Sequence, residues 1–399
     1  MKDLILTNGI IITPFEKIQN RVLFLKGGKI EKLISTEEFE HYDENYISDY
    51  EIIDANNNYI APGFIDIHTH GANDADAVKD PIDQMAEFKV KHGTTGFLPT
   101  LWTAEFDWMV DACKKINDFM KVQSRGSKVL GINSEGPYLN PDLGAQKKEL
   151  VRTPEYKDYR RLVEAGGGNL IVMTVAPELE GALELIKYLR QNNVIVSIGH
   201  TDIKIDKMHE ALDRGITLVT HLLNAMGDSI QVDAGVKALG IQEELLICGQ
   251  LMCEVLSDKK GVHVKPTLLK IILRCKGIEN IVLITDSMNM TGFPPGTYSL
   301  QDGRKAIVKD GEDTVRLENG GLAGSVMTMD RAIGNFINHT GVSLKDAVRM
   351  ATFNPAKAIN FSDRKGEIKE GMDADIAVFD DDIDVKLTIV EGEIRYNKL

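Results

Sequence analysis

The stretch that decides the fold is residues 63–71, GFIDIHTHG, an apolar run that ends in two histidines. In a β-strand, side chains two positions apart point to the same side, so His68 and His70 face one point. Two imidazoles at the end of a strand can share a metal ion. They can equally be two polar residues where a strand leaves its sheet, and the pair alone does not decide between these interpretations.

Similar apolar runs recur along the middle of the chain and alternate with helix-like stretches such as residues 104–122 and 181–193. Units of a strand followed by a helix predict a (β/α)8 TIM-like barrel, here over residues 61–360. The seventh unit is the least defined, because its long run has room for a strand plus a loop. The eight strand-like runs are residues 61–71, 93–102, 128–139, 169–178, 194–201, 216–226, 245–264 and 280–292.

Polar residues that can bind a metal stand at the ends of these runs. In such barrels the carboxyl ends of the strands meet at one mouth, where the chemistry takes place. Histidines that only pack in a core would be scattered along the strands instead. The pattern therefore predicts one metal site at the mouth. Its candidate ligands are His68 and His70 on the first strand, Glu135 on the third, His200 on the fifth, His221 on the sixth and Asp286 on the eighth.

The two ends of the chain differ from the middle. Residues 1–60 and 361–399 are rich in short β-type runs separated by turn residues such as Asn-Gly and Gly-Gly. We expect them to form one small β-sandwich domain, with the barrel inserted between its two parts.

Composition excludes several classes of partner. The 399 residues are 43% hydrophobic, enough for a large core, and the net charge of −14 argues against nucleic acid as a partner. The four cysteines show no C-x-x-C pair, so we expect reduced thiols. The sequence shows no signal peptide and no apolar run of membrane-spanning length. We expect a cytoplasmic protein without a membrane partner.

Several motifs together resemble a known family. They are GFIDIHTHG, SEGPYLNP, SIGHT, THLLNAM, LITDSMNMTG, LAGSVMTMDRAI and the segment from ATFNPAKAIN to DADIAVFD. In this order they are similar to the amidohydrolase superfamily, specifically to its N-acetylglucosamine-6-phosphate deacetylase family. The resemblance implies a metal-dependent barrel with a β-sandwich domain, a homodimer, and hydrolysis of the N-acetyl group of a small amino-sugar phosphate.

The resemblance also implies roles for individual residues. Glu135, His200 and His221 match the metal site common to the family, and His68 and His70 match a second site that only some members have. The fourth strand has no lysine that could bridge two metals, so Glu135 is the expected bridging carboxylate. One or two divalent metals per chain are implied, and zinc, iron, manganese and cobalt all suit these ligands. Asp286 matches the catalytic acid and base, although an aspartate here could also cap a following helix. The expected substrate-binding residues are Ala145, Gln146, Asn224, Ala225, Lys260, His263, Leu322, Ala323 and Gly324.

Two departures concern the substrate. The family usually carries an arginine that binds the phosphate where this chain has Val232, and Lys260, Lys237 or Lys265 could take its place. Gln146 stands where several relatives have a histidine beside the acetyl carbonyl, and we expect its amide to donate a hydrogen bond there.

Three interpretations of the function remain open at this point. The favoured one is hydrolysis of N-acetylglucosamine 6-phosphate to glucosamine 6-phosphate and acetate. The second keeps the reaction and changes the substrate to N-acetylgalactosamine 6-phosphate, an unphosphorylated N-acetyl amino sugar or an N-acyl amino acid. The third is a non-catalytic barrel that only binds, which would be expected to lack Asp286 or a metal ligand.

Overall fold

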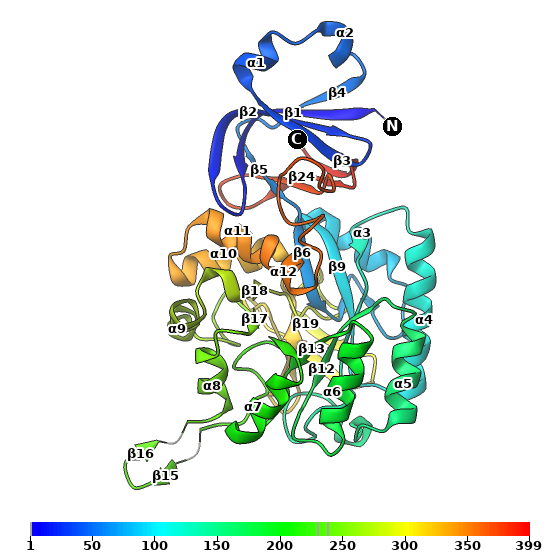
Figure 1. Ribbon diagram of the computed structural model, residues 1–399, viewed down its shortest axis with the longest axis vertical. Helices are drawn as coiled ribbons and strands as arrows, with labels where there is room; N and C mark the ends of the chain where they lie inside the picture. Colours follow the sequence, from blue (N-terminus) through cyan, green and yellow to red (C-terminus); the bar gives the residue numbers. More distant parts are fainter. Residues whose placement is uncertain (1, 230, 238) are drawn as a thin grey trace.

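The structure is a computed structural model. It describes residues 2–229, 231–237 and 239–399, without the side chains at positions 44, 231, 232 and 237. A small sheet domain stands on top of a larger barrel (Figure 1). In the described part of the chain, no helix combines the length and the apolarity needed to cross a bilayer.

The larger part is a parallel barrel, which confirms the predicted fold. Its strands follow the order β6, β9, β11, β12, β13, β14, β17 and β18, with β10 beside β9. The ring is closed where the Asp286 N–H donates to the carbonyl of His68 at 2.9 Å. The strands are β6 (Phe64–Thr69), β9 (Thr94–Leu101), β10 (Lys128–Val129), β11 (Ile132–Glu135), β12 (Leu170–Val175), β13 (Ile195–Ile198), β14 (Ile216–Val219), β17 (Met252–Val255) and β18 (Ile281–Leu283).

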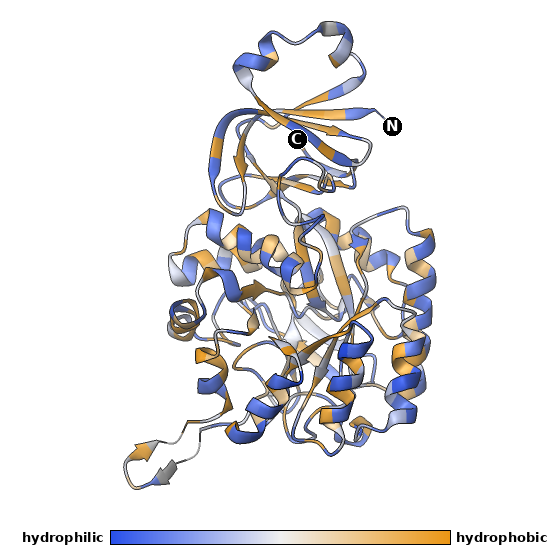
Figure 2. Cartoon of the chain, viewed as in Figure 1, coloured by the Kyte–Doolittle hydropathy of each residue, from blue (hydrophilic) through white to orange (hydrophobic). Residues whose placement is uncertain are grey.

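The helices around the barrel are amphipathic. The helix α4 buries Met109, Val110, Cys113 and Ile116 at helical spacing, and hydrophobic and hydrophilic residues alternate along it (Figure 2). This pattern covers the outer face of the strands with one apolar stripe per helix. The helices are α3 (Asp83–Lys89), α4 (Phe106–Val122), α5 (Tyr156–Ala165), α6 (Ala182–Gln191), α7 (Ile205–Asp213), α8 (Ile241–Ile247), α9 (Pro266–Lys276), α10 (Met329–Thr340), α11 (Leu344–Ala351) and α12 (Phe353–Ala358), with short 3-10 helices η1 (Val90–His92), η2 (Lys148–Leu150) and η3 (Ile278–Asn280).

The seventh unit is more complex than its apolar run indicates. The run of residues 245–264 starts in the last turns of α8, and only Met252–Val255 form the strand. The rest is the loop that leads to α9. Sequence periodicity cannot separate these parts, because a buried helix end and a buried strand are both apolar.

The small domain is a sheet assembled from both ends of the chain. Its order is β25-β24-β23-β5-β1-β2-β3, with β4 beside β1, so a C-terminal strand lies next to an N-terminal one. In the register of that pair, Ile60 of β5 faces Val378 of β23. The separate sheet domain is therefore confirmed, while the domain boundaries at 60/61 and 360/361 stay predictions. Its elements are β1 (Asp3–Ile12), β2 (Lys17–Lys26), β3 (Lys29–Ser35), α1 (Thr36–Glu40), α2 (Glu44–Ile47), β4 (Tyr50–Asp54), β5 (Tyr59–Pro62), β23 (Ile376–Phe379), β24 (Val385–Val390) and β25 (Glu393–Asn397).

Between β18 and α10 the chain forms a four-stranded antiparallel sheet that sequence analysis did not predict. It packs around its own small core, which includes Leu300, Ala306 and Val315. Two further pairs of short strands complete the description: β7 (Gly71–Ala72) with β8 (Ala75–Asp76), and β15 (Gln231–Asp233) with β16 (Val236–Lys237). The four strands of the inserted sheet are β19 (Gly296–Ser299), β20 (Lys305–Val308), β21 (Thr314–Leu317) and β22 (Leu322–Ser325).

Candidate active site

The structure brings the six predicted metal-site residues together at the mouth of the barrel. Glu135 is the last residue of β11, and His200 and His221 lie two residues beyond β13 and β14. His200, His221 and Asp286 have positive φ angles of 48°, 26° and 48°. Such angles are strained for residues with a Cβ, and strain of this kind gathers at functional sites. The side chains are turned into the mouth at the cost of local backbone strain.

The first group of ligand atoms joins three strands. Oε1 of Glu135 lies 2.9 Å from Nε2 of His200 and 2.8 Å from Nε2 of His221. The two imidazole nitrogens are 3.1 Å apart. These atoms are close enough to bind one metal ion together.

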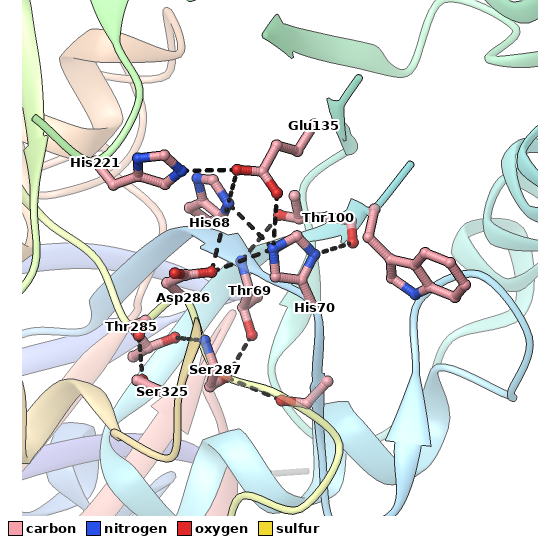
Figure 3. A network of polar contacts seen from close by, with 12 residues as sticks. His68, Thr69, His70, Thr100, Glu135, His221, Thr285, Asp286, Ser287 and Ser325 are labelled. Carbon is pink, nitrogen blue, oxygen red and sulfur yellow. Dashed lines mark hydrogen bonds and ion pairs between the residues drawn. The ribbon is translucent and has the colours of Figure 1, made fainter. Parts of the chain in front are cut away.

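The second group uses the histidine pair of the first strand. The Nε2 atoms of His68 and His70 lie 3.3 Å apart, and Oε2 of Glu135 is 3.2 Å from His70 (Figure 3). Oδ1 of Asp286 also lies 3.2 Å from Nε2 of His70. Glu135 thus offers one oxygen to each group, as the sequence predicted for a bridging carboxylate. Asp286 is followed by turns and β19, and no helix begins between them in this described stretch, so the alternative of a helix cap is wrong.

The outer nitrogens of His68, His70 and His200 support the binding of a cation by this cluster, whereas Nδ1 of His221 is buried without a partner among the described residues. Nδ1 of His70 donates to the carbonyl of Thr100 at 3.0 Å, and Nδ1 of His200 to the carbonyl of Leu143 at 3.0 Å. Nδ1 of His68 donates to the buried carboxylate of Glu254 at 2.8 Å. When Nδ1 carries the proton of a neutral imidazole, Nε2 presents a lone pair. Two lone pairs 3.3 Å apart repel each other unless a cation or a proton lies between them.

The pKa values of the cluster follow from the same crowding. Burial lowers the pKa of His68, but the charges of Glu254 and Glu135 outweigh burial and raise it to about 9. Burial likewise raises the pKa of Glu135, yet the surrounding histidines lower it well below its usual value. His68, His70 and His221, whose pKa values are all raised, therefore hold protons on their imidazoles when no cation is present. A metal must displace these protons to bind.

A cavity of about 360 Å³ opens above the cluster. Its wall includes His70, Glu135, His200, His221 and Asp286. Gly144 (φ 98°) lies against the ring of His200, where a Cβ would approach within 2.4 Å, so only glycine fits. Eight of the nine predicted substrate-binding residues line the same cavity: Ala145, Gln146, Asn224, Ala225, His263, Leu322, Ala323 and Gly324.

Comparison with known proteins agrees with this geometry. The model of the amidohydrolase family matches residues 59–395. The chain belongs to the amidohydrolase family. It is 30% identical over 397 residues to the N-acetylglucosamine-6-phosphate deacetylase of Lysinibacillus sphaericus, covering 98% of each chain. It is 32% identical over 339 residues to the N-acetylgalactosamine-6-phosphate deacetylase of Escherichia coli O157:H7, covering 84% of this chain and 87% of the other. Among solved structures, N-acetylglucosamine-6-phosphate deacetylase from Pasteurella multocida superposes with a TM-score of 0.89 at 26% identity, covering 99% of this chain and 100% of that one.

In this amidohydrolase the amide of Gln146 is oriented differently from our expectation. Its Nε2 already donates to the carbonyls of Asn140 at 3.0 Å and Leu143 at 2.6 Å. Its buried Oε1 has no partner in the described part of the structure. The prediction that this amide donates to the substrate is therefore wrong, because both donor hydrogens are in use. Gln146 can only accept a hydrogen bond on its free side.

His263 is held in place by a buried aspartate. Oδ2 of Asp258 accepts from the backbone N–H of His263 at 2.8 Å and lies 3.3 Å from its Nδ1. The Val262 N–H also donates to this carboxylate, at 2.8 Å. Nε2 of His263 is buried without a partner among the described residues, although His263 lines the cavity. The imidazole thus keeps one nitrogen for a ligand.

Two of the three lysines proposed for a phosphate, Lys260 and Lys265, do not line the cavity. Nζ of Lys260 lies 3.8 Å from Glu312, and its side chain is half exposed. Lys265 is an exposed residue at the start of α9. The side chains of Val232 and Lys237 lie outside the described part of the structure. The role of Lys260 in substrate binding stays a prediction, with no contact that supports it.

Sequence reasoning missed four polar residues of the site. Asp76 and Trp102 line the cavity, and the indole Nε1 donates to the Asp76 carboxylate at 2.9 Å. Glu254 lies behind His68, and Arg304 lies in the cavity wall. The acidic residue inside the apolar run of β17 was the one signal available, because a buried glutamate needs a partner.

Proposed function

We propose that the protein is a metal-dependent deacetylase that hydrolyses N-acetylglucosamine 6-phosphate to glucosamine 6-phosphate and acetate. The observation that carries the proposal is the shared carboxylate of Glu135 between two histidine pairs, with Asp286 beside them and a cavity of about 360 Å³ above. The related deacetylases of known name, which match over almost the whole chain, support the same reaction.

The residues that would hold the metals are defined by their free Nε2 and carboxylate atoms. Glu135, His200 and His221 would hold one divalent cation, and His68 and His70 with Glu135 a second. A bound divalent cation lowers the pKa of a coordinated water and polarises a carbonyl group. The protein orients these ligands through their outer hydrogen bonds and excludes bulk water, since His68 is fully buried and His70 nearly so.

Asp286 would move the proton in this proposal. Burial raises its pKa, but the hydrogen bond to His70 and the positive charges of His68 and His70 lower it below the usual value. The carboxylate is therefore ionised at neutral pH and can accept a proton from the attacking water. The water oxygen bonds to the acetyl carbon, the C–N bond breaks, and Asp286 returns the proton to the amine nitrogen.

One of the relatives supports a second possible substrate. The relative from Escherichia coli O157:H7 is named for N-acetylgalactosamine 6-phosphate and is 32% identical. The two sugars differ only in the orientation of one hydroxyl group. The reaction is the same for both substrates, so the site residues keep the roles proposed for them.

The test is acetate release from a panel of substrates by the metal-loaded protein. The panel contains the 6-phosphates of N-acetylglucosamine and N-acetylgalactosamine, unphosphorylated N-acetylglucosamine, and an N-acetyl amino acid. We expect the highest kcat/KM with N-acetylglucosamine 6-phosphate and loss of activity in chelator. A preference for the galactosamine epimer would change the substrate, and no acetate from any sugar would reject the deacetylase proposal.

We also propose that the protein is a homodimer. Val236, Leu239, Ile247, Leu268 and Ile271 are large apolar side chains that are exposed in the single chain. Ile247 belongs to α8 and Leu268 and Ile271 to α9, two helices on one side of the barrel, and the β15–β16 hairpin with Val236 projects beyond that side (Figure 1). Contact with a second copy would cover them. Light scattering coupled to size-exclusion chromatography measures the mass, and a monomer at micromolar concentration would reject this proposal.

A further inference from the structure

One arginine in the cavity wall has no role in the chemistry described above. Arg304 follows the turn between β19 and β20, and Leu300, Gln301 and Asp302 of the same turn also line the cavity. Among the described residues of the wall, it is the single lysine or arginine. An anionic group of a substrate therefore has one guanidinium to bind inside the cavity.

The guanidinium is held in place and keeps donors free. Nε of Arg304 donates to Oδ2 of Asp302 at 2.6 Å, and Nη1 donates to the carbonyl of Ala145 at 2.6 Å. Oδ1 of Asp302 also accepts from the backbone N–H of Arg304 at 3.0 Å. Nη2 has no partner in the part of the chain that the structure describes. A planar guanidinium held at two of its three nitrogens is preorganised to donate from the third.

Two lysines add positive charge to the same turn. Nζ of Lys79 donates to the carbonyl of Gln301, and Nζ of Lys147 donates to the carbonyl of Asp302 at 3.1 Å. Carboxylates lie nearby as well: Asp302 itself, Asp80, which accepts from Nε2 of Gln301 at 2.8 Å, and Asp76 in the same cavity wall. The turn thus gathers three cationic groups on a chain whose net charge is −14.

We propose that the turn of residues 301–304 binds the phosphate of the substrate through Arg304. The inference rests on the proposed deacetylase function and deepens it by naming the group that recognises the anion. This chain has Val232 where the family usually carries an arginine, and the guanidinium of Arg304, fixed in the cavity wall at Nε and Nη1, offers the free donors of Nη2 to an anion instead.

The test compares Arg304→Ala and Arg304→Lys with the control Lys305→Ala. Lys305 is the next residue, its side chain is 63% exposed, and it does not line the cavity. KM and kcat are measured with N-acetylglucosamine 6-phosphate and with N-acetylglucosamine. We expect Arg304→Ala to raise KM for the phosphorylated sugar about 10- to 150-fold, the range of one charge-assisted hydrogen bond, with little change for the other sugar. Arg304→Lys keeps the positive charge but loses the planar guanidinium, so we expect its KM for the phosphorylated sugar to lie between those of the wild type and Arg304→Ala. We expect the control Lys305→Ala to behave as the wild type.

Equal effects on both sugars, or no effect of Arg304→Ala on the phosphorylated one, would overturn the inference and leave the deacetylase function intact. If Arg304→Ala does not fold, as judged from its thermal unfolding, Arg304→Lys carries the same comparison. If the wild type releases acetate from neither sugar, the proposed function fails separately. The binding of inorganic phosphate, measured by calorimetry, then tests the inference. We expect the Arg304 variants to bind phosphate more weakly than the wild type. Equal affinity in the wild type and the variants, or no binding by the wild type, would reject the inference.

Discussion

Replacing Glu254 by glutamine removes the negative charge behind His68 while keeping the size of the side chain. Glu254 is fully buried, and its Oε2 lies 2.8 Å from Nδ1 of His68. It fixes the proton on Nδ1 and turns Nε2 toward the cluster. Loss of the hydrogen-bond partner of a metal-binding histidine lowers the metal affinity about 10- to 100-fold, which corresponds to roughly 1.4–2.7 kcal/mol of binding free energy. We expect the upper half of that range, because the buried position leaves no water to replace the charge.

The assay separates the two ligand groups. Metal-free wild type and Glu254→Gln are titrated with Zn²⁺ in a competing chelator, and both binding steps are fitted. The step assigned to His68 and His70 should weaken, while the step assigned to Glu135, His200 and His221 should change much less. Glu279→Gln, the same chemical change at an exposed position, serves as the control. Unchanged affinity at both steps, or an equal loss at both, would refute the role given to Glu254.

Three further expectations concern turnover and pH. Asp286→Asn should keep its metal by elemental analysis but lose about 10²- to 10⁴-fold in kcat, and turnover close to wild type would assign the base to another residue. In the metal-free protein the pKa of His68 is raised to about 9. Protonated His68 therefore contributes its full stabilisation of the fold below about pH 6.5, and this stabilisation is lost as the pH rises through 9. Urea unfolding in chelator should show stability falling by up to about 3 kcal/mol across this window, and a rise would contradict it. Burial raises the pKa of Asp258, but hydrogen bonds from His263 and Val262 outweigh burial and lower the pKa to about 2. The ionised carboxylate therefore stabilises the fold above about pH 4, and this stabilisation is lost as the pH falls through 2. Asp258→Asn should therefore cost about 2 kcal/mol at pH 7 and raise KM, and an unchanged unfolding midpoint would count against this.

The barrel and the ligand cluster were predictable because local patterns determine them. Each strand is an apolar run, five of the eight runs end in a residue that can bind a metal, and parallel strands place those residues at one mouth. His68 and Glu135, which are far apart in the sequence, are therefore brought together by topology alone. The seventh strand could not be located within its run, because the end of α8 is as apolar as β17.

The substrate side of the site was less predictable because it depends on loops. The sheet of β19–β22 carries Asp302 and Arg304 to the cavity, and nothing in a local pattern indicates where a hairpin lies in space. The orientation of the Gln146 amide is decided by two carbonyl groups of its own loop. Lys260 is close in sequence to His263 but contacts Glu312 instead of the cavity. Proximity along a loop is therefore a weak guide to a shared site.

The pairing of β5 with β23 has a consequence for the order in which the protein can be made. Ile60 and Val378 face each other in that pair although roughly 300 residues separate them in the chain. A ribosome that adds ~5–20 residues per second needs about 15–60 s between the two. During this interval the barrel can fold, while the open edge of β5 waits for its neighbour. An unpaired edge is a template for aggregation. The most vulnerable period of this enzyme's synthesis is therefore the interval in which the barrel is made, after β5 has appeared and before β23 can pair with it.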